Sequence, residues 1–170
     1  MTTAPFTPPE RECGDCSMCC QGFLQADIHG YSMSPGVPCH FAGQTSCGGC
    51  TIYEDRPEVC QGYQCLWKIS PQLPEWMKPN KADVLITSDQ LEVNGKNQPF
   101  ISVKEGFNHI RGDVLNFILR TCLAHDLNVT YEVHGAWYWQ GDDDWVKEHM
   151  KLAGYRFGTD VTVKQPAQDT

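Results

Sequence analysis

The sequence predicts an α+β fold, in which a small mixed domain carries a cysteine-rich, loop-dominated metal-binding lobe. Three observations lead to this prediction. Nine of the ten cysteines lie between positions 13 and 65. After position 81, apolar and polar residues alternate over short stretches, as in β-strands, and two longer stretches repeat apolar residues at helical spacing. A chain of 170 residues suits about one domain, so we expect both parts to form a single unit.

Prolines and cysteines divide the chain into segments. Residues 1–12 contain three prolines and no apolar run, which predicts a flexible N-terminus. We expect residues 13–69 to form a cysteine-cluster region that binds zinc or iron, and residues 70–157 to form an α+β region packed on it as one domain. The join at 70–81 carries three more prolines and predicts an irregular connector. Residues 158–170 are expected to form a flexible tail.

Five short stretches in the second half alternate apolar and polar residues, which predicts antiparallel strands. Asn94-Gly95 follows the second stretch and is typical of a two-residue hairpin turn. His134-Gly135 separates the fourth and fifth stretches, so we expect these two to pair. The stretches are 84–86, 91–93, 100–102, 129–133 and 136–139.

Two further stretches have helical periodicity. Between 112 and 126, apolar residues recur three and four positions apart and predict one buried helix face. Cys122 lies on this face, where we expect it to pack as a small apolar side chain and not to bind metal. Residues 142–152 predict a second helix, whose three initial aspartates suit the positive end of a helix dipole.

Charge and composition exclude some partners. The formal net charge of −8 repels phosphate backbones, so we expect no nucleic-acid partner. The first residues contain neither the apolar core of a secretory signal nor the length of a membrane anchor, so we expect a cytoplasmic protein without membrane association. Thiols stay reduced in the cytosol, which favours metal ligands or catalytic thiols over disulfides.

The first cysteine cluster reads Cys13-Gly-Asp-Cys16-Ser-Met-Cys19-Cys20 and contains two overlapping C-x-x-C units. A C-x-x-C spacing lets two sulfurs reach one metal ion from a single turn, and three thiols spaced by three are also typical of iron-sulfur loops. The spacing does not distinguish zinc from iron. If Asp15 caps a short helix, the last three cysteines converge on one helix face.

The second cluster comprises Cys39, Cys47-Gly-Gly-Cys50, Cys60 and Cys65. The two glycines permit the tight backbone turn that a metal-binding knuckle needs. His40 directly follows Cys39 and is an additional candidate ligand, although a surface role is the alternative interpretation.

Pro57 is well placed as the first residue of a helix, which puts Cys60 in the first turn. There the helix dipole and the nearby Arg56 should lower the pKa of Cys60 and favour its thiolate. Arg56 therefore has two interpretations. It supports the metal ligands with its charge, or it pairs with Asp55 or Glu58.

These motifs carry a resemblance to a known family. The first cluster, followed by Cys39, Cys50-x-Ile-Tyr-x-x-Arg-Pro-x-x-Cys60 and Cys65, resembles the CxxCxxCC family, the YkgJ-like cysteine-cluster proteins described as zinc- or iron-chelating domains. The resemblance covers residues 13–65. Gln61 stands where the family often has arginine, and Cys47 is extra to the pattern. The ligands that the resemblance implies are Cys13, Cys16, Cys19, Cys20, Cys39, Cys50, Cys60 and Cys65.

The leading functional hypothesis is a metal-binding protein in which zinc or iron helps to fold the cysteine-rich region, and it leaves open whether the chain is an enzyme. The alternative is an iron-sulfur oxidoreductase or electron-transfer protein, whose 4Fe-4S cluster is held by three cysteines of the first motif and a remote one. Thiol-disulfide exchange through Cys47 and Cys50 is a third hypothesis. Eight or nine thiols exceed the four that one site needs, and we favour one main site with spare thiols.

Overall fold

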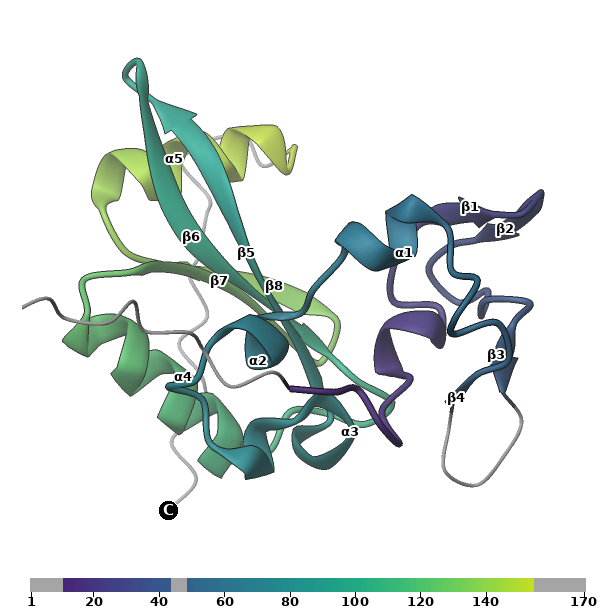
Figure 1. Cartoon of the computed structure of the whole chain (residues 1–170). Helices are drawn as coiled ribbons and strands as arrows, with labels where there is room; N and C mark the ends of the chain where they lie inside the picture. Colours follow the sequence, from purple (N-terminus) through teal and green to yellow (C-terminus); the bar gives the residue numbers. More distant parts are fainter. Residues whose placement is uncertain (1–10, 44–48, 155–170) are drawn as a thin grey trace, which may run out of the picture.

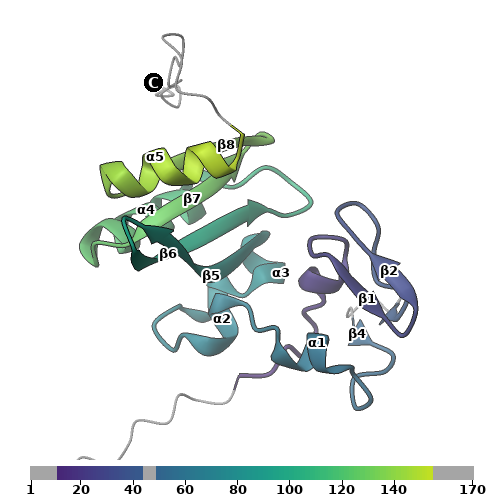
Figure 2. The same cartoon turned by 90° about the horizontal axis from the view of Figure 1, so that it is seen from above.

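The computed structural model describes residues 11–43 and 49–154. These residues form two parts, which lie beside one another in Figures 1 and 2. We call residues 13–65 the cysteine lobe and residues 66–154 the sheet domain. The predicted tail at 158–170 and most of the predicted flexible N-terminus lie outside the described residues.

The sheet domain is built on a four-stranded sheet with the order β5-β6-β7-β8, and the predicted α+β class is confirmed. The predicted stretches 84–86 and 91–93 belong to one ten-residue strand. Asn94 and Gly95 both have positive φ angles, 52° and 76°, so they form the predicted hairpin turn. The strands are β5 (Val84–Val93), β6 (Lys96–Glu105), β7 (Asn128–Val133) and β8 (Ala136–Gln140).

The two middle strands run parallel. β6 pairs with β7 in parallel register, while β5/β6 and β7/β8 are antiparallel. Helix α4 (Gly112–Ala124) connects the parallel strands, because a parallel pair needs a long crossover and not a tight turn. The prediction of antiparallel pairing is therefore wrong for β6 and β7. Alternation of apolar and polar residues identifies a strand but does not indicate its direction.

Helices cover both faces of the sheet. Along a strand, successive side chains point to opposite faces, so Ile101 and Phe100 of β6 face opposite ways. Ile101 belongs to the larger apolar core, with α4 and the buried Cys122, whose predicted packing role is confirmed. Phe100 packs against Trp145 of α5 (Asp143–Leu152) on the other face.

Short helices close the larger core on the side of the cysteine lobe. The proline-rich connector forms η2 (Glu75–Met77) and α3 (Pro79–Ala82), and both contribute buried residues. Helix α2 (Leu66–Ile69) buries Trp67 in the same core. No helix within the described residues is long and apolar enough to cross a membrane.

The cysteine lobe consists of short elements joined by loops. Its apolar cluster has three buried residues, Ile28, Met33 and Cys39. The elements are η1 (Met18–Cys20), β1 (Ala26–Ile28), β2 (Tyr31–Met33), β3 (Ala42–Gly43), β4 (Gly49–Cys50) and α1 (Glu58–Gly62).

Polar links tie the N-terminal end of the lobe to the sheet domain. The guanidinium of Arg11 donates to the carbonyls of Trp67 (2.8 Å) and Leu73 (2.7 Å). Asp15 accepts a hydrogen bond from the buried Lys78 side chain, at 2.5 Å. The start of the cysteine motif therefore has a fixed position beside α2 and α3.

Candidate metal centre

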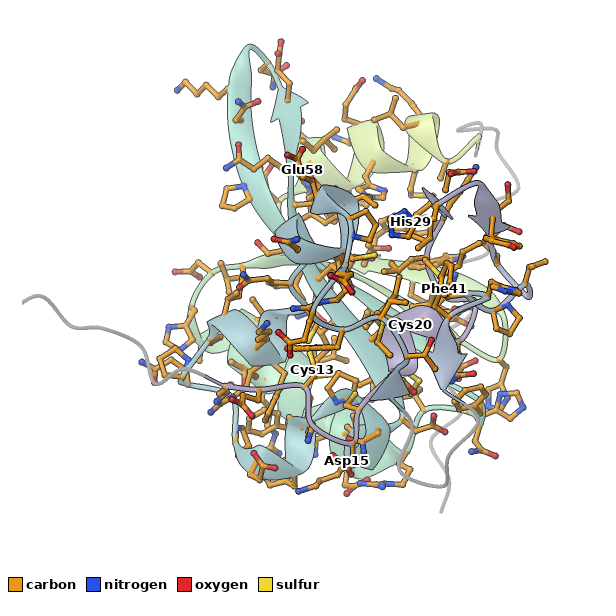
Figure 3. All side chains as sticks on the ribbon, turned by 45° about the vertical axis from the view of Figure 1, so that its right-hand side comes forward. Cys13, Asp15, Cys20, His29, Phe41 and Glu58 are labelled. Atoms are coloured by element: carbon orange, nitrogen blue, oxygen red, sulfur yellow. The ribbon has the colours of Figure 1, made fainter. Side chains whose placement is uncertain are left out.

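Most of the predicted ligands surround one cavity of about 200 Å³ inside the cysteine lobe. The lining cysteines come from η1 and the loop before it, from the loop before β3, from β4 and from α1. Figure 3 shows the side chains of this region. The lining cysteines are Cys13, Cys16, Cys19, Cys20, Cys39, Cys50 and Cys60.

Cys65 is not among the lining residues, but it lies near the cavity, because Cys13 and Cys16 act electrostatically on it. Burial raises the pKa of Cys65, and these two thiols raise it further. Cys47 lies outside the described residues. All nine described cysteines, including Cys122, are free thiols.

The thiols surround the cavity without closing on one point. Among residues 11–43 and 49–154, no three His, Cys, Asp or Glu side chains converge closely enough to hold a metal ion. The structure thus gathers the predicted ligands in one place, and binding an ion would require their side chains to draw together.

The turn that carries the first motif is a 3₁₀ helix, η1, and Asp15 does not cap it. The prediction of an Asp15 cap is wrong because Asp15 binds Lys78 and Asn80, which together lower the pKa of its carboxyl. Lys78 is largely buried, with 9% of its side chain exposed, and the Asp15 carboxylate supplies the opposite charge that it needs there.

The adjacent thiols of Cys19 and Cys20 interact directly. Their sulfurs lie 3.8 Å apart and form a hydrogen bond. This bond raises the pKa of Cys19 and lowers that of Cys20. Cys20 is therefore the thiol that ionises first in this pair.

Backbone N–H groups donate to three of the sulfurs, and in each case one donor is the residue two positions further along the chain. Such donors stabilise a thiolate and orient it. Burial has the larger effect and raises the pKa of all three cysteines, so the donors offset only part of that cost. The pairs are Met18 to Cys16, Ile52 to Cys50 and Trp67 to Cys65.

Cys60 lies in the first turn of α1, as predicted, although Pro57 precedes the helix as its N-cap. The predicted low pKa of Cys60 is wrong. Burial raises this pKa, and the nearby Cys20 and Cys39 raise it further, which outweighs the lowering effect of Arg56. A helix of five residues also has too few aligned peptide groups to form a strong dipole.

Arg56 lies on the wall of the cavity. Its Nε donates to the backbone carbonyl of Tyr53 (2.7 Å). The guanidinium carbon lies 3.5 Å from the centre of the Tyr53 ring. Within the described residues it forms no ion pair with Asp55 or Glu58. Its charge lowers the pKa of Cys20, so the thiols are the charged groups on which Arg56 acts.

The candidate ligand His40 lies away from the cavity. Its ring is exposed and stacks on Tyr31, with ring centres 3.9 Å apart. The same ring meets Phe41 edge-on. This arrangement accounts for the histidine as part of an aromatic surface group.

Sequence reasoning missed Tyr63, which also lines the cavity. Its hydroxyl is buried and has no hydrogen-bond partner among the described residues. Burial raises the pKa of Tyr63, and so do the neighbouring Cys19, Cys65 and Cys20. The hydroxyl is thus placed to donate to a thiolate, and its position two residues before Cys65 was the available signal.

The comparisons add no relative. No family model matches this chain, and neither a curated protein nor a solved structure matches it. The similarity to the CxxCxxCC family therefore stays a prediction from the motif.

The chemistry of the site suits a soft cation. Its donors are thiols, some of which already accept backbone hydrogen bonds, and an unpartnered hydroxyl lies beside them. Thiolates gathered this closely repel one another, and a bound cation relieves that repulsion. Zinc and iron-sulfur clusters are among the metal groups that such ligands favour, together with copper(I).

Proposed function

We propose that this chain is a cytoplasmic metal-binding protein that chelates zinc or iron through the thiolates of its cysteine lobe. One observation carries the proposal. Seven of the eight predicted ligands, from positions 13 to 60, line one cavity of about 200 Å³, although they belong to separate elements of the chain.

The residues that would hold the metal are the eight cysteines of the motif, from Cys13 to Cys65. Burial and mutual repulsion raise the pKa of several of these thiols, so metal binding has to displace protons. Arg56 reduces the negative charge that develops on the wall of the cavity, and Tyr63 offers a hydroxyl proton to a sulfur. The bound metal itself would supply a cross-link between distant segments of the lobe.

The small core of the lobe supports a structural role for this cross-link. Three buried residues in the apolar cluster are few for a region of about fifty residues, and small folds commonly need a metal or disulfides in addition to their core. Because the unfolded chain lacks a formed site, the free energy of metal binding adds to the free energy of folding.

The test is the metal content of the full chain after anaerobic purification, measured as zinc, iron and acid-labile sulfide together with the visible spectrum. Cys20→Ala should lose metal, whereas Cys122→Ala, which alters the core of the sheet domain, should retain it. A wild-type protein that contains no metal and takes up none would contradict the proposal. Iron with sulfide and a brown colour would assign the same thiols to an iron-sulfur electron carrier.

A further inference from the structure

The adjacent cysteines of η1 point in different directions. A 3₁₀ helix has three residues per turn, so the side chains of Cys19 and Cys20 leave it about 120° apart. The side chains of Cys19 and Cys20 therefore diverge at a single peptide bond. Cys16 precedes this helix, and its N–H donates to the carbonyl of Cys13 (2.9 Å).

One group of thiols gathers where the lobe meets the sheet domain. Cys13 and Cys16 act electrostatically on Cys19, although less strongly than its neighbour Cys20, and the same two thiols act on Cys65. The backbone N–H of Asn80, in α3, donates to the sulfur of Cys16. Cys65 is the N-cap residue of α2 and packs against the larger core.

A second group gathers inside the lobe. The N–H of Cys39 donates to the carbonyl of Cys20 (2.8 Å), and both residues share the apolar cluster of the lobe with Cys60. Cys50 pairs with Ala42 across β3 and β4. Cys50 and Cys60 each lie close enough to Cys20 and Cys39 for electrostatic interaction.

Figure 3 labels one thiol of each group. Cys20 is drawn near Phe41, with which it shares the apolar cluster of the lobe, and Cys13 lies closer to the sheet domain. Tyr63 lies near thiols of both groups, because Cys19, Cys65 and Cys20 all raise the pKa of its hydroxyl.

We infer that the eight thiols form two sets of four, which bind two metal ions next to one another. The first set is Cys13, Cys16, Cys19 and Cys65. The second set is Cys20, Cys39, Cys50 and Cys60. Four thiolates complete a tetrahedral zinc or iron site, so this division leaves none of the eight spare. The inference rests on the proposed function and replaces the single main site that the sequence favoured.

The distance between the two sulfurs of the Cys19–Cys20 pair defines the competing arrangement. Their separation of 3.8 Å is also about the distance between two ligands of one tetrahedral zinc ion, about 3.8 Å for Zn–S bonds of about 2.3 Å. In that arrangement both cysteines bind the same ion with two further thiols, and the four thiols that remain would have to be grouped differently from the two sets above. Substitutions that remove two thiols at a time therefore decide between the two arrangements.

The experiment is cobalt(II) titration of the full chain after metal removal under reducing conditions, with visible absorption and elemental analysis as readouts. Two equivalents of tetrahedral thiolate-bound cobalt are expected. One equivalent would overturn the two-set inference and leave the proposed function intact. No thiolate-bound cobalt would overturn the proposed function itself.

Paired substitutions test which thiols act together. Cys16→Ser with Cys65→Ser removes half of the first set, and the protein should still bind one cobalt ion in the second set. Cys16→Ser with Cys60→Ser damages both sets, and both ions should be lost. Loss of both ions from the first pair, with the tryptophan fluorescence of the sheet domain unchanged, would show one shared centre and overturn the inference.

Discussion

The two parts of this chain differ in what holds them together. The sheet domain has ten-residue strands, β5 and β6, and an apolar core of twelve buried residues. The cysteine lobe has strands of two or three residues and three buried residues in its cluster. The lobe instead gathers thiols around a cavity.

The two parts are therefore stabilised in different ways. Burial of apolar surface stabilises the sheet domain, and the effect grows with the area buried. The lobe buries too little for that route, so the proposed metal ions would contribute the missing free energy. The following predictions test whether the two parts depend on different forces.

Metal removal should have the largest effect. A chelator should abolish amide hydrogen-exchange protection in the cysteine lobe and leave the protection of β5 and β6 in place. Structural zinc sites contribute on the order of 10 kcal/mol of apparent binding free energy, which exceeds what the apolar cluster of the lobe can supply. Unchanged protection in the lobe after complete stripping would contradict the comparison.

Trp145→Ala should destabilise the sheet domain by about 3–5 kcal/mol, because this side chain is fully buried against Phe100 and Val93. Urea unfolding followed by circular dichroism measures the change. Metal content should stay at the wild-type level. Trp76→Ala is the matched control, since Trp76 is 40% exposed and its loss should cost much less.

Tyr63→Phe should have effects of opposite sign in the two states of the lobe. Without metal, loss of the unpartnered buried hydroxyl should be neutral or stabilise by about 1 kcal/mol. With metal, loss of a hydrogen bond to a thiolate should speed metal transfer to a competing chelator. Tyr53→Phe, at the cavity wall beside Arg56, is the control. Equal transfer rates for both variants would exclude the hydrogen bond.

Asp142→Ala should destabilise the sheet domain by about 1 kcal/mol, because its carboxylate caps α5 by accepting from the N–H groups of Asp144 and Trp145. The urea midpoint should fall with an unchanged slope. Asp143→Ala leaves the cap in place and should cost a few tenths of a kcal/mol. A similar loss in both variants would mean that charge, and not capping, stabilises this helix end.

Asp15→Ala should have the most local effect. Its loss leaves the buried Lys78 without its carboxylate, so hydrogen exchange should accelerate around residues 13–16 while the sheet domain stays protected. The exposed pair of Lys81 and Glu75 offers the control, because Glu75→Ala should leave exchange in the cysteine motif unchanged.

The regular part of the fold could be predicted because its signals are local. Asn94-Gly95 and His134-Gly135 both form two-residue turns with positive φ angles, as expected from their residue types. The start of α5 at the aspartates was equally predictable. The parallel pairing of β6 and β7 was not, because it depends on where α4 returns the chain.

The candidate site was also predictable only in part. Cysteine spacing, together with the resemblance to the CxxCxxCC family, predicted the thiols that line the cavity. It did not predict the partner of Asp15, because Lys78 is 63 residues away. Nor did it predict the pKa of Cys60, since that value depends on burial and on thiols that the fold brings near.

The ties between Arg11, Asp15 and the segment from Trp67 to Lys78 also bear on how the chain is made. A ribosome delivers the N-terminal cysteines first, before Cys65 and the helices that anchor Asp15 exist. The nascent lobe therefore presents Cys13, Cys16 and Cys19 without their fourth partner for as long as some fifty residues take to emerge. During vectorial synthesis, the second set has all its thiols once Cys60 has emerged from the ribosome. The first set is completed last.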